Sequence, residues 1–138
     1  MKAIISLSSD EKSLLKEIGE AKRYPLTRFE LRSSKDGELR STALSNVHLE
    51  SVNDTMEAVK ARGALLQRLS DLGYVLLDFR VQLLVASDYT VYEESAIYAQ
   101  LCALAESGKS RPDYLFDIPH IKKGRVELTG KGKKAIHI

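Results

Sequence analysis

Two groups of side chains, far apart in the chain, are the best suited to chemistry with a ligand. In the first group, Gln67 and Arg68 lie on a leucine-rich segment that ends near residue 72. Gln can form two hydrogen bonds with adenine and Arg with guanine, so these two residues are candidates for base contacts in DNA. Lys60 and Arg62, in the preceding turn, are better suited to phosphate contacts. An ordinary solvated helix face is the alternative.

The second group consists of Lys122, Lys123 and Arg125. The stretches 114–121 and 126–129 are typical of strands, so these basic residues are expected at the tip of a tight hairpin. At such a tip they could contact the DNA backbone or enter a minor groove. A soluble hairpin without a ligand is the alternative.

The charge of the chain is small overall but unevenly distributed. From residue 120 to the end, six basic residues accompany one acid, Glu127, whereas residues 69–119 contain three basic residues and eight acids. A basic end beside an acidic middle can orient the protein on an anionic partner. A lysine-rich end that only maintains solubility explains the same pattern.

Catalysis and metal binding are not favoured by the sequence. His48, His120 and His137 are far apart, and none has a histidine partner four residues away. A single cysteine, Cys102, excludes an internal disulfide and a cysteine-built zinc site, and its place on an apolar helix face predicts a small buried side chain. Because Gly130–Lys133 lacks the spacing of a phosphate-binding loop, we predict no catalytic residues, no metal and no cofactor.

The elements that would position these residues fit one domain over residues 1–138. Ser8 and Glu11 have the spacing of a capping box, which predicts a helix from about Ser9 to Arg23. Asp36-Gly37 predicts the turn of a hairpin. A helix over 90–107, apolar on one face and alanine-rich on the other, is a candidate surface for a homodimer, and a short helix is expected over 129–136.

The segment 54–72 needs a break if it is helical. With Leu65, Leu69 and Leu72 on the buried stripe, Arg62 would fall near the centre of that stripe. The sequence therefore predicts two short helices joined by a turn at Arg62–Gly63, with Asn53 or Asp54 as the N-cap. Gly73 is the expected C-cap, and 74–85 is expected to be a strand.

Composition points to a cytoplasmic protein. Hydrophobic residues make up 43% of the chain and charged residues 29%, which is ordinary for a globular protein. No apolar run reaches the roughly 20 residues that span a bilayer. The first residues, MKAIISLSSDEKS, do not form a convincing signal peptide.

Two segments carry a resemblance to a known class of protein. Leu65–Asp78, LLQRLSDLGYVLLD, resembles the recognition helix and first wing strand of winged-helix transcription regulators of the MarR and PadR groups. Val126–Ile136, VELTGKGKKAI, resembles their second wing strand and the start of the following helix. The resemblance implies an α+β winged helix-turn-helix domain with an extra hairpin and an inserted helix, double-stranded DNA as the partner, and a role in transcription regulation.

The chain departs from this pattern in the length of the wing. More than forty residues separate Asp78 from Arg125, far more than in a usual wing. Either the helix over 90–107 is inserted within the wing, or the hairpin at 122–124 forms the wing in another connectivity. A protein-interaction module of the adaptor or antitoxin type, without DNA binding, is the alternative function, and a small hydrolase or nuclease ranks third.

Overall fold

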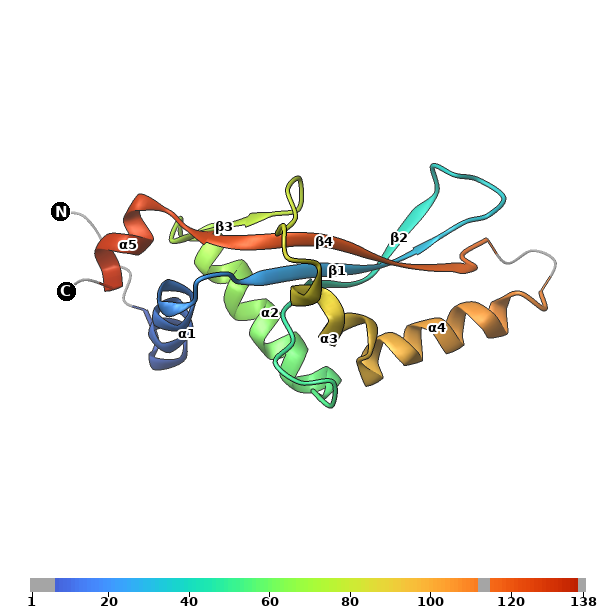
Figure 1. Cartoon of the computed structure of the whole chain (residues 1–138), viewed down its shortest axis with the longest axis horizontal. Coiled ribbons are helices and arrows are strands. Elements are labelled where there is room, and N and C mark those ends of the chain that lie inside the picture. Colours follow the sequence, from blue (N-terminus) through green and yellow to red (C-terminus); the bar gives the residue numbers. More distant parts are fainter. Residues whose placement is uncertain (1–6, 112–114, 137–138) are drawn as a thin grey trace.

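The computed structural model describes residues 7–111 and 115–136 and shows an α+β protein (Figure 1). One antiparallel sheet of four strands is packed with helices. The elements follow the chain in this order: α1 (Ser9–Glu20), β1 (Pro25–Arg32), β2 (Arg40–Val47), α2 (Met56–Asp71), β3 (Val75–Asp78), the 3₁₀ helix η1 (Ala86–Tyr89), α3 (Thr90–Glu93), α4 (Ala96–Gly108), β4 (Ile118–Leu128) and α5 (Gly130–Ile136).

The sheet is built around the two strands β1 and β4. Its spatial order is β2-β1-β4-β3, so β4, the last strand in sequence, lies in the middle. β1 and β4 pair over eight residues, from Pro25 opposite Arg125 to Arg32 opposite Ile118. β3 pairs with the end of β4, from Val75 opposite Leu128 to Asp78 opposite Arg125. Figure 1 shows β1 and β4 as two long strands that run side by side.

The predicted hairpin at residues 122–125 is wrong, because β4 passes through these residues without a turn. Gly124 has another role in the strand: a Cβ atom there would collide with the Asp78 carbonyl oxygen and crowd Phe79. The glycine therefore allows a close approach of two chain segments. Tyr114, the predicted start of this strand, lies outside the described residues.

One half of the core joins the sheet to α1 and α2. Leu66 and Leu69 of α2 pack with Leu15 of α1, Leu26 of β1 and Val126 of β4, and all five side chains are buried. Burial of such side chains removes apolar surface from water and is the main stabilising contribution here.

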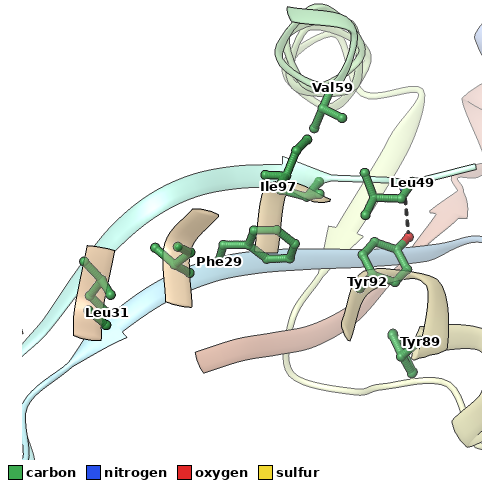
Figure 2. Packing of buried hydrophobic residues seen from close by; sticks show 10 residues of the cluster. Phe29, Leu31, Leu49, Val59, Tyr89, Tyr92 and Ile97 are labelled. Carbon is green, nitrogen blue, oxygen red and sulfur yellow. Dashed lines mark hydrogen bonds between the residues drawn. The ribbon is translucent and has the colours of Figure 1, made fainter. Parts of the chain in front are cut away.

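The other half of the core lies between the sheet and the segment η1–α3–α4. Figure 2 shows Phe29 of β1 near Ile97 of α4 and Tyr92 packed beside Leu49, with Leu31 of β1 at one end of the same cluster. The Tyr92 hydroxyl is buried and satisfied, because it accepts a hydrogen bond from the Leu49 amide at 3.3 Å and donates one to the Pro25 carbonyl at 3.1 Å. Tyr92 therefore connects α3 to Leu49, which follows β2, and to Pro25 at the start of β1.

Several local predictions are confirmed. The capping box of α1 is present, with the Glu11 amide donating to the Ser8 hydroxyl and the Ser8 amide to the Glu11 carboxylate. The β1–β2 hairpin surrounds the predicted turn at Asp36–Gly37. The C-cap of α2 is Leu72 and not Gly73 as predicted, but Gly73 follows it with a φ of 84°, the left-handed conformation that favours glycine after a helix. The short final helix is α5.

The predicted break in α2 is wrong, because the helix is continuous from Met56 to Asp71. Its buried stripe consists of Val59, Gly63, Leu66 and Leu69. Gly63 fits this stripe because the helix approaches the backbone of β2, where an added Cβ atom would lie 3.0 Å from the Asn46 carbonyl oxygen. The stripe is thus rotated away from the position assumed in the sequence analysis.

Other boundaries also differ from the prediction. The N-cap of α2 is Thr55, whose hydroxyl accepts from the Ala58 amide, and neither Asn53 nor Asp54 has this role. The strand expected over 74–85 is limited to β3, because it pairs only with the end of β4. The helix expected over 90–107 is divided into α3 and α4, since Ser95 caps a new helix by accepting from the Tyr98 amide.

Within the described residues, no helix combines the length and the apolar character needed to cross a lipid bilayer. The first residues, which are not expected to form a signal peptide, include residues 1–6, and these lie outside the described residues.

The packing of the core predicts that a buried leucine and an exposed leucine contribute differently to the free energy of unfolding. Leu66→Ala removes a side chain that is fully buried, so the free energy of unfolding should fall by about 2–5 kcal/mol. Leu104→Ala is the matched control, because this leucine is also helical but 54% exposed, and its cost should be below about 1 kcal/mol. Urea denaturation at pH 7 measures both values, and equal losses in the two variants would contradict the packing described.

Candidate nucleic-acid interface

Alternation along β1 separates apolar from charged side chains. Phe29 and Leu31 point to the core that contains α4. Arg28, Glu30 and Arg32 therefore point to the opposite side of the strand. Two ion pairs confirm that these three side chains share a side, since the Glu30 carboxylate lies 3.7 Å from the Arg28 guanidinium and 3.2 Å from that of Arg32.

Neighbouring strands add further basic residues to this side. Lys122 of β4 is the partner of Arg28, His120 of β4 is the partner of Glu30, and Arg40 of β2 is the partner of Arg32. Directly opposite residues of an antiparallel pair project to the same side of the sheet. We call the resulting set the basic sheet surface: Arg28, Glu30, Arg32, Arg40, His120 and Lys122.

Glu30 organises the centre of the basic sheet surface. Its side chain is only 5% exposed and lies between the two β1 arginines, which are themselves partly exposed. The Arg28 guanidinium also stacks over the Phe79 ring at 4.4 Å from its centre. A buried carboxylate and an aromatic ring thus limit the positions of the arginine side chains.

The electrostatic balance of this surface is positive. Two arginines from β1, Arg40 and Lys122 supply four cations against the single carboxylate of Glu30, a net charge of 4 − 1 = +3. No carboxylate among the described residues is within ion-pair distance of Arg40 or Lys122. The pKa of His120 lies below its ordinary value because the ring is partly removed from water and faces Arg32. Its neutral form can donate or accept a hydrogen bond.

The predicted site residues on α2 are placed differently. Arg62 pairs with Glu50 at 2.8 Å, and Arg68 pairs with the buried Glu11. The Gln67 amide nitrogen donates to Asp71, and its oxygen accepts from Asn46 at 2.9 Å. These three side chains are therefore already engaged within the protein.

The exposed side of α2 carries no excess charge. Lys60 is exposed and lines a pocket of about 370 Å³ between α2 and β2. Lys60 and Arg68 on this side are balanced by Glu57 and Asp71. A helix with this balance attracts phosphates less than the basic sheet surface does.

The predicted residues of β4 divide between the two sides of the sheet. Lys122 belongs to the basic sheet surface, whereas Lys123 and Arg125 alternate with it and face the other side. Lys123 lies 3.8 Å from Glu93 and over the Tyr89 ring. Arg125 pairs with Glu127 at 3.0 Å and borders a pocket of about 410 Å³ beside α1. The structure therefore does not bring the seven predicted residues into one surface.

The remaining candidates stay separate as well. His48 and His120 lie in different places, the first stacked on Tyr24 and the second on the basic sheet surface. His137 lies outside the described residues. Cys102 on α4 is partly buried.

Sequence reasoning missed Arg28, Arg32, Arg40 and His120. A signal for the first two was available, because the TRFELR stretch alternates apolar and charged residues in a strand. For Arg40 and His120 no local signal exists, since the pairing register alone places them beside Arg32 and Glu30.

Fold and site together define an α+β protein whose antiparallel sheet carries a basic surface on the side opposite α4. Comparison with family models, with curated proteins and with solved structures finds no match to this chain.

Glu30 offers a test of how the basic sheet surface is held. Glu30→Gln removes the charge that faces Arg28 and Arg32, so the free energy of unfolding should fall by about 1–3 kcal/mol. Glu38→Gln, at an exposed position of the β1–β2 turn, should change it by less than about 0.5 kcal/mol. Urea denaturation measures both, and an undiminished stability of Glu30→Gln would show that the carboxylate does not organise the arginines.

Proposed function

We propose that the protein binds double-stranded DNA through the basic sheet surface. The observation that carries this proposal is the gathering of four cations around one carboxylate on one side of three adjacent strands. Phosphate contacts supply most of the affinity in non-specific DNA binding, and arginine is well suited to them because its guanidinium can donate two parallel hydrogen bonds.

The spacing of the cations fits a duplex. Arg28 and Arg32 are four residues apart on one strand, a separation of roughly 13 Å at about 3.3 Å per residue. This length is close to the roughly 12 Å width of the major groove of B-DNA. Arg40 and Lys122 extend the surface onto the strands on either side of β1. Cations at these places can therefore reach phosphates on both edges of a groove.

The winged-helix assignment belongs to this proposal in a modified form. β3 follows α2 and pairs antiparallel with β4, which leads into α5. This order supports a relation to the recognition helix, paired wing strands and following helix of winged-helix regulators. The segment from Phe79 to Asp117, with η1, α3 and α4, is then the insertion within the wing.

Transcription regulation and homodimerisation stay predictions. Phosphate contacts carry no sequence information, so a regulator would need base contacts in addition. For a homodimer, the alanine-rich side of α4 is the candidate surface, and Ala96, Ala99 and Ala103 are exposed there.

A second candidate function is a protein-interaction module. It is favoured by apolar side chains in the segment between β3 and η1: Leu84 is fully exposed, Val81 is 46% exposed and Val85 is 39% exposed. Apolar residues grouped in one exposed segment are typical of contacts with another protein.

Removal of unpaired cations tests the DNA-binding proposal most cleanly. The double variant Arg40→Gln/Lys122→Gln leaves no buried carboxylate without a partner, because neither residue forms an ion pair among the described residues. Fluorescence anisotropy with a short random-sequence duplex at several salt concentrations measures the affinity. Loss of two phosphate contacts should reduce the slope of log affinity against log salt by about 2 and weaken binding at all sequences alike.

The control variant changes two predicted contact residues of α2. Lys60→Gln/Gln67→Ala removes two predicted contacts of a recognition helix and should leave affinity and slope unchanged. If this variant loses binding while the sheet variant keeps it, α2 is the DNA-binding element and the basic sheet surface is not. If the unmodified protein does not bind the duplex even at low salt, the protein-interaction module is favoured.

A further inference from the structure

Three side chains outside the basic sheet surface come together where α1 faces the segment between β2 and α2. They are Glu17, His48 and Glu50, and one potential ligand atom from each lies within 4.8 Å of the other two. We propose that these residues form a binding site for a divalent transition-metal ion of the zinc class. Imidazole nitrogen and carboxylate oxygen are ligands that such ions accept.

The histidine is held in the form that a metal requires. His48 Nδ1 lies 2.7 Å from the Pro25 carbonyl oxygen, and since a carbonyl only accepts, Nδ1 carries the proton. Nε2 then has a free lone pair. Donation from the second ring nitrogen to a carbonyl is the usual arrangement of a metal-binding histidine.

Neighbouring side chains orient both carboxylates. The Tyr24 hydroxyl donates to Glu17 Oε2 at 2.7 Å, which leaves Oε1 for a ligand. Arg62 Nη1 lies 2.8 Å from Glu50 Oε1, which leaves Oε2. The Tyr24 ring is also stacked on His48, with ring centres 3.8 Å apart and planes inclined by 10°. One tyrosine thus positions two of the three ligands.

The charge of the cluster favours a cation. The two carboxylates and the Arg62 guanidinium give −2 + 1 = −1. Metal–ligand distances of about 2.1 Å place the ligand atoms of a tetrahedral site about 3.4 Å apart. A separation of up to 4.8 Å therefore closes by small rotations of Glu17 and Glu50, which are both exposed.

An ion can reach this site from solvent. Glu17 and Arg62 border a surface pocket of about 200 Å³ that is also lined by Asp10 and Ser13. Glu17 and Glu50 are both exposed, so water can complete the coordination, since three protein ligands and one water form a common zinc geometry. A bound ion would join α1 to the segment that leads into α2.

Titration of the full chain with Zn²⁺ at pH 7 in an isothermal calorimeter tests the proposal. One ion per chain should bind, and the melting temperature should rise because the ion binds the folded state. Glu17→Gln and Glu50→Gln keep a hydrogen-bond acceptor for Tyr24 and Arg62, yet each should weaken Zn²⁺ binding at least tenfold. In ¹⁵N spectra, Zn²⁺ should shift the Nε2 signal of His48 much more than the Nδ1 signal.

Two controls separate this site from accidental binding at surface residues. Glu20→Gln changes an exposed carboxylate of the same helix that pairs with Lys16, and His120→Gln changes the histidine of the basic sheet surface. Both should keep the Zn²⁺ affinity of the unmodified protein. The absence of one-to-one binding, full affinity in Glu17→Gln and Glu50→Gln, or an equal loss in either control would overturn the proposal.

Discussion

The pairing of β1 with β4 is the interaction on which the rest of the structure depends. Eight consecutive residue pairs join strands that lie almost a hundred residues apart in the chain. β2 is attached to the outer side of β1, and β3 to the outer side of β4, so both edges of the sheet depend on this central ladder. Because side chains alternate along each strand, the same ladder determines which residues enter the core and which form the basic sheet surface.

The alternation of side chains along β1 and β4 explains how one sheet supports both an apolar core and a charged surface. At Leu26 the side of β1 that later carries the arginines is covered by α1 and α2, whereas from Arg28 onward the same side is polar. The opposite side is packed against α4 through Phe29 and Leu31. Charged residues are thus held on a support that is stabilised by apolar burial, and their position does not depend on flexible loops.

Features with local causes were predictable from the sequence. The capping box at Ser8, the turn at Asp36–Gly37 and the left-handed glycine after α2 each depend on residues within a few positions of one another. The α+β class, which the resemblance implied, is also observed.

Features with distant causes were not predictable. The Lys-Lys-Gly-Arg stretch has the composition of a turn, yet it is extended because β1 pairs along its whole length and Phe79 needs space above Gly124. Glycine is typical of a helix break, yet α2 continues through Gly63. The glycine is needed there because the backbone of Asn46 lies too close for a larger side chain. The basic sheet surface was likewise predictable only in part. Arg28 and Arg32 alternate with apolar residues in the sequence of β1, whereas the positions of Arg40 and Lys122 beside them depend on how β2 and β4 pair with β1.

The central place of β4 has a consequence for biosynthesis. Ribosomes release a chain from its N-terminus, so β1 and β2 emerge long before residues 118–128. Until then, β1 has an unpaired edge whose amide and carbonyl groups can attach to foreign strands. The nascent protein therefore stays susceptible to aggregation until β4 has been synthesised, and chaperone occupancy during synthesis should depend on how quickly β4 is made.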